Sequence, residues 1–229
     1  MDQPHRDQPK PSLGRRILTR PLLAIVNRLL VADQQHRASQ FAALGAAPGR
    51  VVFLGDSITQ GGLWDEWFPD VAVLNRGIGG ERTADVLRRL DTAINEPTAV
   101  FLLIGTNDVM ALTPLDEIAR NVAAILVGIE QRAPGTPVFV QSVMPRGAAY
   151  RDEVHALNRR YAELVAHRPD HVRYVDLWPA LATADDVLNP EFTRDRLHLN
   201  GLGYRAWVGI LEPLVTPFAA PEHLDTPHH

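Results

Sequence analysis

The chain has 229 residues, of which 45% are hydrophobic and 22% charged, and its formal net charge at pH 7 is −4. This length suits one domain with a buried core, and this composition is typical of a soluble globular protein rather than a disordered, collagenous or membrane chain. The acidic balance disfavours nucleic acid as a partner, and the absence of cysteine excludes disulfides, thiolate metal ligands and a cysteine nucleophile.

Residues 1–49 are predicted to form an N-terminal extension that contains one amphipathic helix. Arginines precede an apolar stretch that begins at Pro21, as in a signal peptide, but Asn27 and Arg28 interrupt this stretch. It is also shorter than the ~20 apolar residues that a membrane span needs. We therefore expect no transmembrane span and favour a cytoplasmic protein, with secretion left open.

Apolar residues recur at helical spacing over residues 21–43, which predicts the amphipathic helix of the extension. The favoured interpretation is that its apolar stripe packs on the domain or on a second subunit, so a homo-oligomer through this helix is one expectation. Contact with a membrane surface is the weaker alternative.

Residues 50–215 alternate β-branched runs with helical periodicity, which predicts one α/β domain with a parallel sheet wrapped by helices. The predicted strands are Val51–Leu54, Val71–Leu74, Ala99–Ile104, Val138–Val143 and Val172–Asp176. The predicted helices are Thr83–Ile94, Leu115–Arg132, Arg151–His167 and Gly203–Leu211. Residues 216–229, rich in proline and histidine, are predicted to be a loose tail.

Four polar or glycine-rich segments follow the predicted strands. They are Gly55-Asp56-Ser57, Gly77-Ile78-Gly79-Gly80, Gly105-Thr106-Asn107-Asp108 and, further along the chain, Asp195-Arg196-Leu197-His198. Each has an ordinary explanation as a helix cap, a tight turn or a surface charge. Because the loops at the carboxyl ends of parallel strands converge on one edge, the four together predict a site there.

This set of side chains contains the parts that acyl transfer needs. A serine hydroxyl becomes nucleophilic when an imidazole takes its proton, and the imidazole needs an acceptor on its other nitrogen. We predict Ser57 as the nucleophile, His198 as the base and Asp195 as the acceptor. The spacing of three between Asp195 and His198 would bring them together in a helical turn.

The negative oxygen of a tetrahedral intermediate also needs hydrogen-bond donors. The candidates are the backbone N–H of Ser57, the side-chain amide of Asn107 and a glycine N–H, for which chemistry alone leaves Gly79 and Gly80 open. Trp64 and Met110 follow the catalytic loops closely and are candidates for lining the substrate pocket.

No cofactor and no metal are expected. The glycine-rich segment at Gly77 has Arg82 where a dinucleotide-binding loop would need a third glycine, and the chain contains neither a Walker pattern nor an H-E-x-x-H pattern.

Gly55-Asp56-Ser57, Gly80, Gly-Thr-Asn107-Asp and Asp195-x-x-His198-Leu resemble, in this order, the four blocks of the SGNH/GDSL hydrolases. The segment from Asn75 to Thr83, Met144-Pro-Arg-Gly and the Leu-Gly-Tyr after His198 are similar to the branch that contains the catalytic subunits of platelet-activating-factor acetylhydrolase. The resemblance extends from about Val51 to Leu211. It implies a flavodoxin-like three-layer α/β/α sandwich with a five-stranded parallel sheet of order 2-1-3-4-5, and Gly80 as the oxyanion-hole glycine.

The expected activity is therefore that of a serine esterase that uses no cofactor. Its expected partner is a small acyl ester, such as a short-chain ester or an acetylated carbohydrate. A lysophospholipase or thioesterase acting on longer chains is the alternative, and a non-catalytic binding module on the same fold is a third. The joint presence of Ser57, Gly80, Asn107, Asp195 and His198 favours the enzyme.

Overall fold

The computed structural model describes residues 31–219. Its centre is a five-stranded sheet in which every pairing is parallel and the strand order is β2-β1-β3-β4-β5. The strands are β1 (Val51–Gly55), β2 (Val73–Gly77), β3 (Ala99–Leu103), β4 (Val138–Gln141) and β5 (Val172–Val175). The predicted fold class and strand order are confirmed.

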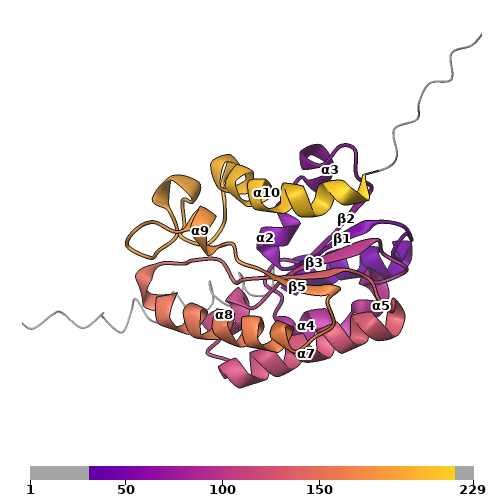
Figure 1. The fold of residues 1–229 in the computed structure, drawn as a ribbon, viewed down its shortest axis with the longest axis horizontal. Coiled ribbons are helices and arrows are strands. Elements are labelled where there is room, and N and C mark those ends of the chain that lie inside the picture. The colour runs from indigo at the N-terminus through magenta and orange to yellow at the C-terminus, as the bar shows by residue number, and fades with distance from the viewer. Residues whose placement is uncertain (1–30, 220–229) are drawn as a thin grey trace, which may run out of the picture.

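Helices cover both faces of the sheet, as Figure 1 shows. One layer contains α4 (Thr83–Arg88), α5 (Leu90–Ala93), α7 (Leu115–Arg132) and α8 (Arg151–Ala166). The other contains α2 (Ser57–Gln60), α3 (Trp64–Trp67), α9 (Trp178–Leu181) and α10 (Gly201–Val215), while α6 (Thr106–Met110) follows the end of β3. Alternate residues of each strand point to opposite faces, so Val52 packs in the first core and Phe53 in the second.

Strand β2 lies later in the chain than predicted, at Val73–Gly77 rather than Val71–Leu74. Val71 is buried in the core before the strand begins, whereas polar Asn75 and Arg76 lie within it. Both side chains are satisfied by backbone carbonyls, since Asn75 Nδ2 donates to Gln60 O at 3.0 Å and Arg76 Nη2 to Gly45 O at 2.6 Å. Apolar patterning alone does not show that two polar residues continue a strand.

The helix predicted over Thr83–Ile94 is divided into α4 and α5, so that prediction was wrong. The break is at Arg89, where the backbone leaves helical geometry (φ −117°, ψ 21°). Its guanidinium is buried against the carboxylate of Glu81, with Nε to Oε2 at 2.8 Å. The predicted helix Leu115–Arg132, in contrast, is confirmed at both ends.

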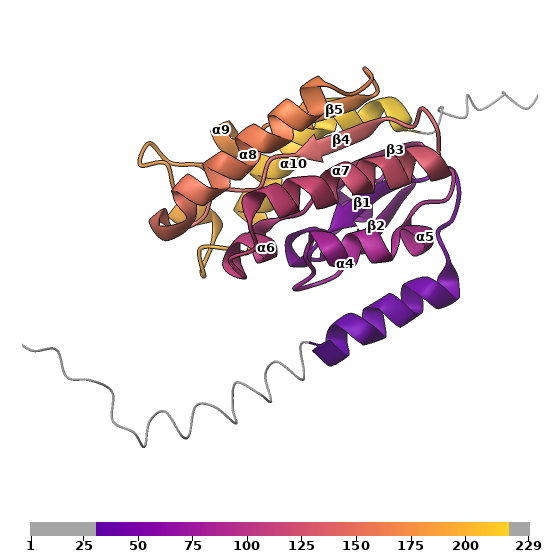
Figure 2. The same cartoon turned by 90° about the horizontal axis from the view of Figure 1, so that it is seen from below.

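Of the helix predicted over residues 21–43, the structure describes residues 31–43, which are helical, and the helix continues to residue 44; residues 21–30 lie outside the described part. This helix runs beside α4 and α5, at the edge of the molecule away from α8 (Figure 2). Phe41 is its buried anchor, 6% exposed, with the Arg76 guanidinium 4.5 Å from the ring centroid. The helix therefore packs on its own domain. Between residues 31 and 219, no helix has the length and hydrophobicity needed to cross a membrane.

The C-terminal boundary also differs from the prediction. Thr216–Phe218 forms a turn of 3-10 helix, and Phe218 and Ala219 pack against the core on the α10 side of the sheet. A loose tail beginning at residue 216 is therefore wrong for 216–219, because Phe218 has apolar neighbours there. Residues 220–229 lie outside the described part.

Candidate active site

Ser57 is the first residue of α2, directly beyond the carboxyl end of β1. The chain can turn so sharply because Gly55 has no side chain: a Cβ there would lie 2.2 Å from the carbonyl oxygen of Leu103. Asp56 caps the helix, since its Oδ1 accepts the Ile58 N–H at 3.0 Å. Tyr204 of α10 donates its hydroxyl hydrogen to Ile58 O at 2.7 Å and so braces the same turn.

The structure brings together the three residues predicted to act on one another. Ser57 Oγ lies 3.0 Å from His198 Nε2, and His198 Nδ1 lies 2.6 Å from Asp195 Oδ2. The side chains of His198 and Asp195 are 49% and 52% exposed. A hydrogen-bonded path thus runs from an accessible serine hydroxyl through an imidazole to a carboxylate.

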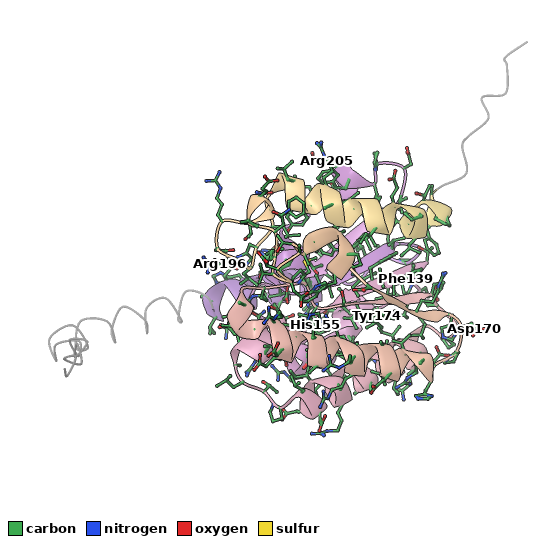
Figure 3. All side chains as sticks on the ribbon, turned by 60° about the vertical axis from the view of Figure 1, so that its left-hand side comes forward. Phe139, His155, Asp170, Tyr174, Arg196 and Arg205 are labelled. Atoms are coloured by element: carbon green, nitrogen blue, oxygen red, sulfur yellow. The ribbon has the colours of Figure 1, made fainter. Side chains whose placement is uncertain are left out.

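Asp195 and His198 meet in a loop, not in the helical turn that their spacing predicted. Asp195 Oδ1 accepts the backbone N–H groups of Leu197 at 3.0 Å and His198 at 2.8 Å, which folds the loop around the carboxylate. Arg196 between them has a positive φ of 63°. Figure 3 shows Arg196 at one end of the molecule and Asp170, just before β5, at the opposite end, so the loop lies at the carboxyl edge of the sheet.

Two carboxyl groups of the site have opposite pKa shifts. Partial burial works to raise the pKa of Asp195, but the hydrogen bonds from the His198 ring and from the backbone N–H groups of His198 and Leu197 outweigh it and hold this pKa well below its usual value. Asp56 is fully buried, and burial raises its pKa to about 7. Asp195 is therefore a carboxylate throughout the physiological range, whereas Asp56 titrates within it.

Asn107 lies in α6, beyond the carboxyl end of β3, and its amide is held by the neighbouring loop. Its Nδ2 donates to Glu81 O at 2.9 Å. An amide nitrogen carries two hydrogens, so this bond fixes the orientation of the group and leaves a second N–H for another acceptor. The adjacent Asp108 is buried and accepts the Thr83 N–H at 3.0 Å, which ties α6 to the start of α4.

The structure distinguishes between the two glycines that chemistry left open. The Gly79 N–H already donates to Gln60 Oε1 at 2.7 Å. The Gly80 N–H has no acceptor within residues 31–219, and Gly80 has a φ of +74°. Of the two glycines, Gly80 thus has the N–H that is free to bind a ligand.

Trp64 does not line the site, so this prediction was wrong. Its side chain is 1% exposed, stacked on Phe53 with ring centroids 4.1 Å apart and edge-on to Trp207 at 4.7 Å. Its indole N–H is satisfied by Thr59 O at 2.9 Å. The ring is a core residue that supports β1 and α2. Met110, at the end of α6, is 46% exposed and stays a candidate for the pocket.

The sequence analysis did not identify the residues whose side chains bind the backbone of the site loops. Gln60, one turn after Ser57, binds Gly79, and Tyr204 binds the carbonyl of Ile58. The buried pair Glu81–Arg89 holds the segment after Gly80, because Arg89 Nη2 also donates to Arg76 O at 2.9 Å. The family resemblance included Tyr204, in Leu-Gly-Tyr, and Glu81, in the segment from Asn75 to Thr83, but it assigned them no role. Gln60 and Arg89 gave no signal in the sequence.

Among the residues that the structure describes, no group of three or more His, Asp or Glu side chains is placed to hold a metal ion.

A doubly wound α/β sheet with a serine, a histidine and an aspartate hydrogen-bonded at its carboxyl edge defines the class of α/β hydrolytic enzymes. The chain belongs to the GDSL-like Lipase/Acylhydrolase family, whose model matches residues 53–206. It is 34% identical to bovine (Bos taurus) platelet-activating factor acetylhydrolase IB subunit alpha1 over 164 residues, 67% of this chain and 69% of the relative.

Solved structures agree with this assignment. A structure from Streptococcus pneumonia, provisionally described as a platelet activating factor, superposes with a TM-score of 0.79 at 26% identity, covering 85% of this chain and 98% of that one. A carbohydrate esterase family 3 protein from Talaromyces cellulolyticus shares the fold at 20% identity, with a TM-score of 0.61 over 74% of this chain and 97% of that one. The chain is thus a hydrolase of the GDSL type, resembling platelet-activating factor acetylhydrolase subunits.

Proposed function

We propose that this chain is a serine esterase that hydrolyses small acyl esters through an acyl-enzyme. The observation that carries the proposal is the continuous hydrogen-bonded path from Ser57 Oγ through His198 to Asp195. Family membership supports hydrolysis of esters in general, and this path supports the assignment of the three catalytic roles.

In the proposed reaction, Ser57 Oγ attacks the ester carbonyl carbon while His198 Nε2 takes the hydroxyl proton. Asp195 keeps the Nδ1 hydrogen of the ring in place and stabilises the imidazolium that forms. The tetrahedral intermediate collapses when His198 returns the proton to the departing alcohol, which leaves an acyl group on Ser57. Water, activated by the same imidazole, then releases the acid.

The negative oxygen of the intermediate would be bound by the backbone N–H groups of Ser57 and Gly80 and by the side chain of Asn107. The free N–H of Gly80 and the anchored amide of Asn107 support this set of donors. Both are fixed before substrate arrives, which is the condition for donors to stabilise a transition state.

Exposed charged side chains close in sequence to Ser57 and Asp195 support short acyl groups and a hydroxylated alcohol portion such as a sugar. Asp65 and Glu66 in the segment after Ser57, and Arg194 and Arg196 beside Asp195, are all exposed. A long acyl chain gains affinity only where many methylenes are buried, at about 0.8 kcal/mol each. Exposed charges do not supply such burial.

Exposed apolar side chains favour a second candidate function, the lysophospholipase or thioesterase. They occur in the segments that follow Ser57, Asn107 and His198, namely Leu63 (58% exposed), Met110 (46%), Leu112 (86%) and Leu202 (55%). If they form one surface around the serine, that surface would suit a longer acyl chain.

A panel of chromogenic esters of increasing acyl length, together with carbohydrate acetates, distinguishes these functions. We expect kcat/KM to be highest from acetyl to about butyryl and to fall steeply past about six carbons, since each methylene without an apolar groove adds no binding. A profile that rises through eight to twelve carbons would replace the short-acyl proposal with the second candidate. No turnover on any ester would instead favour the binding module.

The pH profile tests the base. We expect kcat/KM to rise from weakly acidic to weakly alkaline pH, because an imidazole accepts the serine proton only in its neutral form. The low pKa of Asp195 keeps the orienting carboxylate ionised over this range. Ionisation of Asp56, whose pKa is about 7, would be a second cause of a change in kcat/KM over this pH range. The variant Asp56→Asn keeps an oxygen to cap α2 but cannot ionise, so a pH dependence that disappears in this variant belongs to Asp56, and one that persists is consistent with an imidazole base.

A further inference from the structure

The N-terminal helix contacts the loop that carries Gly80. Arg37 Nε donates to Gly77 O at 2.6 Å, and Gln34 Nε2 donates to Gly79 O at 2.7 Å. Phe41, one turn further along, is buried beneath the Arg76 guanidinium, and Arg76 also binds the carbonyl of Gly45 just after the helix. The N-terminal helix thus binds the glycine loop through Gln34 and Arg37, and it packs against Arg76 of β2 through Phe41.

The bond from Gln34 acts on the peptide unit that supplies the free donor. The Gly79 carbonyl and the Gly80 N–H belong to the same planar group, in which C=O and N–H point in opposite directions. Holding the oxygen toward Gln34 consequently directs the Gly80 N–H away from it. The preceding N–H, that of Gly79, is held by Gln60.

The peptide between Gly79 and Gly80 needs the hydrogen bond from Gln34 because glycine side chains do not restrict its rotation. Glycine restricts its backbone least of all residues, so a Gly-Gly unit can rotate the peptide and turn its N–H out of the site. Gly80 has a φ of +74°, and a Cβ added to it would lie 2.6 Å from Gln34 Nε2. Gln34 thus closes the side of the loop opposite to the N–H.

We infer that Gln34 is a positioning residue for the oxyanion donor Gly80, so that the N-terminal helix supports the active site through this side chain and is not only a packing or self-association element. This inference rests on the proposed function. Gln34 does not touch substrate; it acts through the Gly79–Gly80 peptide.

Gln34→Ala and Gln34→Glu test it. Alanine suits a helix and removes the side chain, whereas glutamate keeps the size but puts an oxygen where the donor was. We expect both to lower kcat roughly 5- to 50-fold with little change in KM, less than the ~10²–10³ for outright loss of an oxyanion donor. Labelling of the active serine by a phosphonate should slow by a similar factor. The exposed neighbour gives a matched control, Gln35→Ala, which should behave as wild type.

Rates are expressed per active site, counted by phosphonate titration, and melting temperatures are measured alongside. Wild-type kcat in Gln34→Glu, or a loss that appears only as a lower melting temperature or fewer active sites, would overturn the inference. A Gln35→Ala loss equal to that of Gln34→Ala would do the same. Failure of the proposed function appears separately, as hydrolysis that survives in Ser57→Ala.

Discussion

Replacing Ser57 by alanine should abolish ester hydrolysis while the protein stays folded. The change removes the nucleophilic oxygen and its hydrogen bond to His198 Nε2, and it opens no core cavity, because Ser57 lies in a half-exposed turn. We expect a loss of ~10⁴-fold or more, the scale on which members of a serine triad act as a unit. Turnover of a short chromogenic ester, with circular dichroism to verify folding, measures it.

The matched control is Ser39→Ala, which removes an exposed hydroxyl from the N-terminal helix and should leave turnover unchanged. A serine-directed phosphonate should add its mass to the wild-type peptide that contains Ser57 and to no other. A well-folded Ser57→Ala protein that retained most of its activity would remove the proposed nucleophile, and with it the triad.

Asn107→Ala should give the second largest effect, a decrease in kcat of roughly 10²–10³ with little change in KM. Its amide would bind an oxygen that is fully charged only in the transition state, so substrate binding should change little. Steady-state kinetics on the best ester of the panel measure the two constants separately.

A nearby asparagine provides the control for loss of structure. Asn121 Nδ2 donates to Thr83 Oγ1 at 3.0 Å, so Asn121→Ala, like Asn107→Ala, removes one side-chain hydrogen bond but no proposed oxyanion donor. It should affect stability more than turnover. If Asn107→Ala raised KM alone, Asn107 would bind substrate in the ground state and the oxyanion role would be wrong.

The sheet could be predicted because its strands are apolar on both faces and its longest helix has a regular apolar stripe. The predicted bounds Leu115–Arg132 agree with α7 at both ends, because the buried residues of this helix recur with one regular helical period of 3.6 residues. The bounds of β2 and the break between α4 and α5 could not be predicted, because Arg76 and Arg89 are buried through long-range contacts with carbonyls and with Glu81. Such contacts leave no periodic signal.

The candidate site was predictable for a different reason. Ser57, Asn107, Asp195 and His198 each follow a strand or occur in a recognisable block, and sheet topology brings strand ends together. What supports them was not predictable, because Gln34 and Gln60 contact glycines through single side-chain hydrogen bonds. Trp64 was misassigned because closeness in sequence to Ser57 does not tell which way a ring points.

The loop that joins Asp195 to His198 has a consequence for how activity appears during folding. The imidazole and its carboxylate are three residues apart and meet within one turn, whereas the serine and the imidazole are 141 residues apart. Local contacts close quickly, and contacts between distant segments require most of the chain to be in place. The acid–base pair can therefore assemble before the sheet is complete, but its meeting with Ser57 requires β1 and the C-terminal third of the chain to be docked. Recovery of hydrolysis after dilution from denaturant would then follow the final assembly of the domain, later than the recovery of helical signal.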